Sequence, residues 1–166
     1  VVQSYFGVPG PDDATLLEWV RVLFWDIFQN LGDDPTVRRR ADLAAAAFQD
    51  YLDRLICDQR AAIRAGGAPD TVLNRLLRMQ AEPTTALDDA AVRRNIGGTI
   101  VGAVDTVSKA FVQAIEQLLK RPPALADARA AALAGNDDLV ARSLWEAMRF
   151  NPQNPFLYRL CEEAYT

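Results

Sequence analysis

The chain has 166 residues, of which 50% are hydrophobic and 24% charged, and its formal net charge is −4. This composition is that of a globular protein, and the length suits a single domain spanning residues 1–166. The acidic balance does not favour a nucleic-acid-binding surface. No targeting segment or membrane span is visible in the sequence.

Two residue types set limits on the chemistry. The sequence contains no histidine, which excludes histidine-based di-iron and zinc sites and any catalytic triad built on histidine. It contains two cysteines, Cys57 and Cys161, with no Cys-x-x-Cys pattern. This usage suits a reducing compartment rather than a disulfide scaffold.

The first half of the chain predicts three helices. Asp12 or Asp13 caps the first, which runs to about Asn30. The Asp-Pro pair at 34–35 starts the second, which runs to about residue 64, before a Gly-Gly pair. Asp70 is expected to cap a short third helix. Residues 1–11, rich in glycine and proline, are expected to form a loop.

A long central helix is expected over residues 88–121. Acidic residues open it, Lys120 and Arg121 close it, and the Pro-Pro pair at 122–123 stops it. Its circumference is mostly apolar, which is typical of a buried helix. Asp105 and Lys109 interrupt the apolar run too often for a membrane span.

Two further helices and one strand are expected near the C-terminus. An alanine-rich helix follows the proline pair to about residue 134, and Asn136 caps a last helix over 137–150. The proline-bounded segment 155–160 predicts a short edge strand. The fold class is therefore mainly α, with one short C-terminal strand.

One face of the central helix carries no bulky side chain. Residues at three- and four-residue steps share this face: Thr99, Gly102, Ala103, Thr106 and Ala110, with Gly98 beside them. A glycine inside a helix costs about 1 kcal/mol relative to alanine, which suggests a use for the missing side chains. Something flat can come close to this face. Close packing of another helix, with Asp105 paired to Lys109, is the alternative.

A second group of interest lies in the last helix, where Glu146 and Arg149 are three residues apart. The apolar stripe of that helix lies elsewhere, at Val140, Leu144 and Ala147–Met148. The pattern alone therefore predicts an exposed ion pair of small energetic value.

The segment 102–106, Gly-Ala-Val-Asp-Thr, resembles the central-helix motif of cytochromes P450, which is written Ala/Gly-Gly-x-Asp/Glu-Thr-Thr/Ser. The match holds at Gly102, Asp105 and Thr106. The sequence departs at Ala103, where the family often has glycine, and at Val107, where a second hydroxyl is common.

The segment 144–152, followed by Pro-Phe-Leu-Tyr-Arg at 155–159, resembles the Glu-x-x-Arg helix of the same family and the turn and strand that follow it. The two motifs and the helices between them fall in the family's order. The resemblance implies a partial cytochrome P450-like helical fold. It also implies that Glu146 and Arg149 belong to a buried structural ion network, and that Arg159 meets a haem propionate.

The resemblance assigns roles to the central helix as well. Thr106 would position water or hydrogen-bond the bound dioxygen, and Asp105 would connect that site to bulk protons. Gly102 and Ala103, together with Thr106, would line the haem. The first helix, around Phe24, Trp25 and Phe28, would roof the substrate pocket.

The implied cofactor is haem b, and its cysteine ligand sits in a glycine-containing loop. Neither Cys57 nor Cys161 has that setting, so the ligand is expected outside this chain and no metal ligand is assigned within it. The implied parent is a cytoplasmic monooxygenase that activates O2 and oxidises a small organic substrate. Its electron donor would be a ferredoxin or a flavoprotein. The chain alone is expected to be inactive.

Two alternatives remain open from the sequence. One is a P450-like enzyme that uses peroxides, such as an isomerase or peroxygenase of lipids, because some of these lack the acid–threonine pair. The other is a non-catalytic helical interaction domain. It explains an exposed Glu146–Arg149 pair and the small helix face without haem, but not the order of the two motifs.

Overall fold

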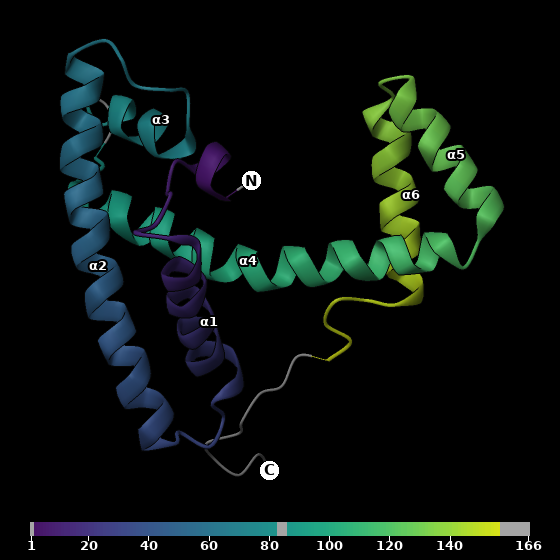
Figure 1. Cartoon of the computed structure of the whole chain (residues 1–166), viewed down its shortest axis with the longest axis horizontal. Helices are drawn as coiled ribbons and strands as arrows, with labels where there is room; N and C mark the ends of the chain where they lie inside the picture. Colours follow the sequence, from purple (N-terminus) through teal and green to yellow (C-terminus); the bar gives the residue numbers. More distant parts are fainter. Residues whose placement is uncertain (1, 83–85, 157–166) are drawn as a thin grey trace, which may run out of the picture. The chain divides into compact units, whose positions relative to one another are not determined.

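The computed structural model describes residues 2–82 and 86–156, and the chain divides into two compact units, residues 1–105 and 106–166. Figure 1 shows the helices of each unit. The described residues are helical or irregular, without strands, and the mainly α fold class is confirmed. The expected strand at 155–160 lies almost entirely outside the described residues.

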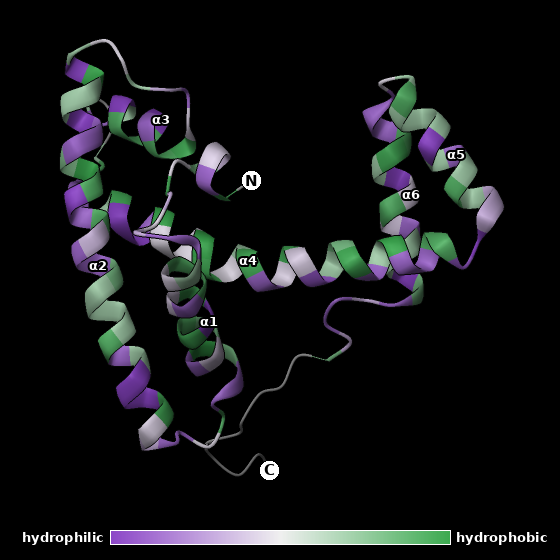
Figure 2. Ribbon diagram, in the orientation of Figure 1, coloured by the Kyte–Doolittle hydropathy of each residue, from purple (hydrophilic) through white to green (hydrophobic). Residues whose placement is uncertain are grey.

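The first unit is built around an antiparallel pair of helices, α1 (Asp13–Gln29) and α2 (Pro35–Arg64). They lie side by side in Figure 1. Apolar and polar residues are mixed along α2 in Figure 2, as expected for a helix with one buried stripe. That stripe includes Phe48, Leu52 and Ile56, which join the buried core of the first unit.

A short helix, α3 (Val72–Met79), and the first part of α4 (Asp89–Leu119) complete this core. α3 contributes Leu73 and Leu77, and α4 contributes Val92, Ile96 and Ile100. These side chains come from separate segments of the chain, so the core fixes the position of α4 against α2 and α3.

Three of the expected helix caps are confirmed. The carboxylates of Asp12 and Asp34 accept hydrogen bonds from the backbone N–H groups of Thr15 and Thr36. Asn136 accepts one from Leu139 in the same way. Each cap satisfies a backbone donor that the first turn of a helix leaves unpaired.

The expected cap at Asp70 is wrong by one residue. Thr71 caps α3, and its hydroxyl accepts a hydrogen bond from the backbone N–H of Asn74. Asp70 instead binds the guanidinium of Arg75 through two hydrogen bonds of 2.7 and 2.8 Å. Both residues are cap formers, and the arginine one turn further on captures the carboxylate.

The expected N-terminal loop is also partly wrong, because η1 (Val2–Phe6) is a short π-helix. Gly7, whose φ is +77°, follows its last residue, and the next residue, Val8, is buried in the core. A Cβ built on Gly7 lies 2.4 Å from Oγ1 of Thr71. The N-terminal segment therefore approaches the cap of α3 as closely as a bare backbone allows.

The central helix α4 ends at Leu119, ahead of the proline pair as expected. Burial is confirmed for its first turns but not throughout. The apolar residues exposed in its second half are Val107, Phe111, Val112 and Leu119. An apolar circumference thus overestimates burial in this chain.

The second unit contains the end of α4 and a helical hairpin, α5 (Pro122–Leu133) and α6 (Asp137–Phe150). Its small core is made of Ala114, Leu118, Ala128 and Ala147, with Leu144 and Met148 packed against it. The apolar stripe expected for the last helix is confirmed at Leu144, Ala147 and Met148. The three alanines let the helix backbones approach closely.

Replacing Gly7 and Gly66 with alanine separates backbone strain from packing. Gly7 and Gly66 have φ angles of +77° and +76°, but a Cβ on Gly66 meets nothing within 4 Å. Both variants carry the strain of a left-handed residue, about 1–2 kcal/mol. We expect Gly7→Ala to lose at least about 2 kcal/mol more than Gly66→Ala in urea unfolding, because it also displaces Thr71. Equal losses would contradict the close approach.

Candidate functional site

Three glycines of α4 have different surroundings. A Cβ built on Gly97 lies 3.1 Å from Cδ1 of Leu52 and 3.6 Å from Cε1 of Phe48, so this glycine lets α4 pack on α2. A Cβ built on Gly98 or on Gly102 meets nothing within 4 Å in the described structure. Close helix packing therefore explains Gly97 alone, and the surface at Gly98 and Gly102 is open.

This open surface forms one side of a pocket of about 400 Å³ that lies within the first unit. The pocket lies between α1, α2 and α4, and most of its lining is apolar. α1 provides Leu23, Ile27 and Phe28, and the middle of α2 provides a wall that includes Phe48. A concave, mainly apolar pocket with few polar groups is the usual form of a small-molecule site.

The roofing residues expected from α1 separate into two groups. Phe28 lines the pocket, and its ring packs on Phe24 with centroids 4.8 Å apart. Trp25 is exposed and lines a different hollow together with Val37. The face of α1 that meets the pocket is therefore the one carrying Leu23, Ile27 and Phe28.

Four residues of the predicted site lie within five consecutive positions of α4. Gly102, Ala103, Asp105 and Thr106 are all partly buried, and Gly102 lines the pocket. Thr106 is the first residue of the second unit, whereas the other three belong to the first. Their roles toward haem and oxygen stay predictions.

Asp105 lies beside a cation that the sequence did not indicate. Its Oδ1 is 3.7 Å from Nε of Arg21 on α1, and its side chain is 30% exposed. The carboxylate thus has contact with water as well as with a neighbouring helix. The sequence does not reveal this contact, because Arg21 and Asp105 are far apart along the chain.

Glu146 and Arg149 form the ion pair that their spacing predicts. Nε and Nη2 of Arg149 donate to the two carboxylate oxygens of Glu146 over 2.9 and 2.6 Å. This bidentate contact lowers the pKa of Glu146. The side chains are 58% and 65% exposed. The buried network implied by the resemblance therefore stays a prediction, and the described atoms do not enclose the pair.

Of the remaining residues singled out in the sequence, the structure brings no described one into the pocket. Arg159 and Cys161 lie outside the described residues. Cys57 is an exposed free thiol on α2. Within the described ranges, no group of three histidine, cysteine or acidic residues could hold a metal ion, and no helix is long and apolar enough to cross a membrane.

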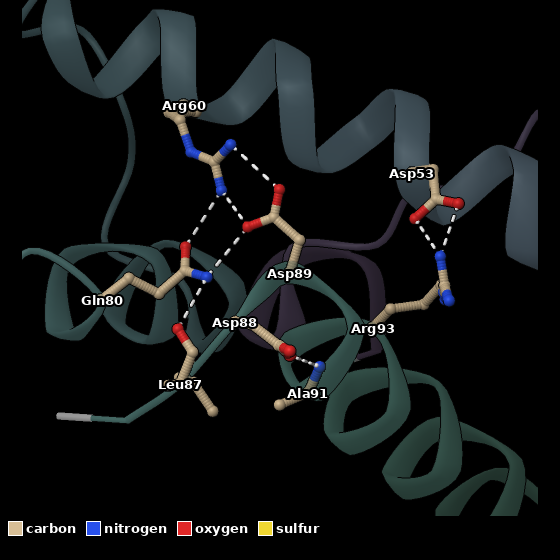
Figure 3. A network of polar contacts seen from close by, with 8 residues as sticks. All are labelled: Asp53, Arg60, Gln80, Leu87, Asp88, Asp89, Ala91 and Arg93. Carbon is tan, nitrogen blue, oxygen red and sulfur yellow. Dashed lines mark hydrogen bonds and ion pairs between the residues drawn. The ribbon is translucent and has the colours of Figure 1, made fainter.

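A polar network that the sequence did not reveal fixes the start of α4 (Figure 3). The guanidinium of Arg60 on α2 donates to the carboxylate of Asp89 and also to Oε1 of Gln80, over 3.0 Å. The amide of Gln80 in turn donates to Asp89 and to the carbonyl of Leu87. Asp88 caps α4 by accepting from the backbone N–H of Ala91.

One turn further along α4, Arg93 makes a second link to α2. Its Nη1 lies 2.6 Å from both carboxylate oxygens of Asp53. Together with the Arg60–Asp89 pair, this contact fixes the axial position of α4 on α2. The open glycine surface therefore faces the pocket from a clamped helix.

Comparisons with known proteins agree with the resemblance at a coarse level. The chain is 26% identical over 176 aligned positions to "Putative cytochrome P450 137" of Mycobacterium tuberculosis, in strain CDC 1551 / Oshkosh and equally in strain ATCC 25618 / H37Rv. The match covers 100% of this chain and 37% of each relative, so the chain spans little more than a third of their length. No family model and no solved structure matches. The chain is thus distantly similar to one part of a protein named as a putative cytochrome P450.

Replacing Asp89 with asparagine tests the clamp through its pH dependence. Hydrogen bonds from Arg60, and then from Gln80, lower the pKa of Asp89 in the folded protein. A lowered pKa stabilises the fold above the unfolded value, about 4, and that stability is lost as the pH falls through the folded value. Asp89 is half exposed, so we expect Asp89→Asn to cost no more than about 1 kcal/mol at pH 7.

The difference between Asp89→Asn and the wild type should shrink as the pH falls below about 4, measured by urea unfolding over a pH series. Asp58 is exposed on the same helix as Arg60 and makes no ion pair with a described residue, so Asp58→Asn is the matched control. A difference that stays constant into acid would show that the carboxylate does not act through its charge.

Exchanging adjacent glycines of α4 for alanine tests whether the surface at Gly98 is open. Gly98→Ala should raise the free energy of unfolding by about 0.5–1 kcal/mol, because alanine is the better helix former and its Cβ meets nothing. Gly97→Ala should show no such gain, because its Cβ presses on the buried Leu52. Thermal unfolding of both variants provides the measurement, and an equal gain at both positions would contradict the difference.

Proposed function

We propose that this chain is part of a haem-thiolate monooxygenase that oxidises a small organic substrate. The observation that carries the proposal is the match of the whole chain to about a third of "Putative cytochrome P450 137". In this chain, the motif at 102–106 lies on α4, and its Gly102 lines an apolar pocket. The Glu-x-x-Arg pair on α6 is compatible with the proposal but does not single it out, because the three-residue spacing of Glu146 and Arg149 is enough to produce their contact.

The open surface of α4 fits a flat cofactor. Apart from the backbone of α4 itself and the adjacent residues, no described atom lies within 4 Å of a Cβ position on Gly102, so a planar ring can approach the helix there. When bound, haem supplies the activation of O2, so that one oxygen atom enters the substrate and the other leaves as water with two protons and two electrons from a donor.

The protein's own contribution would be to orient the substrate and to deliver protons. Asp105, partly exposed and adjacent to Arg21, is placed to exchange protons with water. Thr106, the next residue, would hold a proton-donating hydroxyl toward the reacting oxygen. The apolar walls of the pocket would hold an organic substrate against α4.

A peroxide-using enzyme is the competing reading, because it needs no proton delivery to O2. The retained Asp105–Thr106 pair favours the monooxygenase. Turnover of the parent protein with O2 and a reductant, compared with turnover with a peroxide, separates the two.

The carbon monoxide spectrum of the reduced, haem-loaded protein tests the proposal. We expect a thiolate-type spectrum from the longest native reading frame that contains this chain, and none from the 166-residue chain, because neither Cys57 nor Cys161 has the sequence setting of a thiolate ligand. A longer protein without a thiolate-type spectrum would refute the proposal. A thiolate-type spectrum from the 166-residue chain would place the ligand within it.

A further inference from the structure

The pocket beside α4 has one charged end. Its lining is apolar except for Gln49 on α2 and two arginines, Arg93 and Arg94, that precede the glycine surface on α4. Arg94, Gly98 and Gly102 follow one another at four-residue steps, so they lie along one side of the helix. At 1.5 Å per residue, the row is about 12 Å long.

The two arginines differ in what they bind. The guanidinium of Arg93 is bound to the carboxylate of Asp53, which raises the pKa of Arg93. Arg94 is exposed and, among the residues that the structure describes, has no carboxylate within ion-pair distance. The pocket therefore has one arginine whose charge is already balanced and one whose charge is available to a ligand.

An available arginine at the end of an apolar pocket selects a particular chemistry. Its planar fork of donors matches a carboxylate, which it can bind through two parallel hydrogen bonds. The exposed position of Arg94 leaves the bound carboxylate in contact with water, so its desolvation is limited. An alkyl chain can follow the row of glycines between α1 and α2, where each buried methylene adds about fourfold in affinity.

We propose that this pocket binds an unbranched organic monocarboxylate, with its carboxylate on Arg94 and its alkyl chain along Gly98 and Gly102. As a statement about the substrate class of the monooxygenase, the proposal rests on the proposed function. As a statement about a binding site, it stands on the pocket and on Arg94 alone.

Calorimetric titration of the 166-residue chain with dodecanoate tests the site without haem. We expect Arg94→Gln to weaken dodecanoate binding about ten- to a hundredfold and Arg94→Lys to recover part of the loss. Dodecan-1-ol has the same alkyl chain without the charge, so it should bind more weakly than dodecanoate and be unaffected by Arg94→Gln. The same exchange at Arg129, an exposed arginine of α5, is the matched control and should change neither affinity.

Gly98→Leu tests the position of the alkyl chain. The surface at Gly98 is open, so leucine is compatible with the fold and should fill the pocket instead. We expect this variant to weaken the binding of dodecanoate and dodecan-1-ol alike, with an unchanged helical circular dichroism spectrum. Equal binding of the acid by the wild type and by Arg94→Gln, no binding of dodecanoate, or full affinity in Gly98→Leu would each overturn the proposal.

These outcomes are separable from those for the enzyme. Loss of the acid site leaves the carbon monoxide spectrum of the longer protein unaffected, and the proposed function then stands with another substrate class. Dodecanoate binding that depends on Arg94, in a longer protein without a thiolate-type spectrum, supports the site and refutes the enzyme.

Discussion

The contact between α2 and α4 at Gly97 is the constraint on which the rest of the first unit depends. A Cβ there would lie 3.1 Å from Cδ1 of the buried Leu52, so any side chain at this position would push that methyl group aside by a few tenths of an ångström. The ion pairs of Arg60 with Asp89 and of Arg93 with Asp53 then stop α4 from sliding along α2. Because both pairs lie on the N-terminal side of Gly97, the clamp and the close contact act on adjacent turns.

Packing against α2, which accounts for Gly97, does not account for the other two glycines of α4. Gly98 and Gly102 carry the same cost in helix stability as Gly97, but no described packing contact requires them. A helix that retains two costly residues beside an apolar pocket is best explained by an approach to the backbone that a side chain would block. The loss of helix stability at these glycines is local, and the ion pairs of α4 with α2 offset it by holding the preceding turns of the helix in place.

Local signals in the sequence were sufficient for most helices. Asp12, Asp34 and Asn136 act within three residues of themselves, so the caps follow from the order of residues alone. Asp70 failed as a cap because Arg75, which is equally local, competes for its carboxylate. The short π-helix at Val2–Phe6 was missed because no local pattern indicates it: Val2 and Phe6 pack against a core built by distant segments of the chain.

The site was less predictable because its geometry joins distant segments. The small residues of α4 could be read from their spacing, but spacing did not distinguish Gly97, which packs, from Gly98 and Gly102, which do not. That distinction depends on Leu52, in another helix. The ion pair of Arg93 with Asp53 likewise depends on the alignment of α4 with α2. The sequence alone could not show which of the two adjacent arginines, Arg93 or Arg94, would be paired with a carboxylate.

The ion pair of α6 connects this partial structure with the proposed parent. Burying a single charge is costly. A carboxylate that already accepts two hydrogen bonds from a guanidinium can be buried at lower cost, because several of its hydrogen-bonding positions are already filled. Glu146 and Arg149 are in that state while still exposed to water, and Arg149 also lies over the ring of Phe150. In the proposed enzyme, further protein atoms would cover a pair whose geometry α6 has already set, since three-residue spacing on one helix is enough to form it.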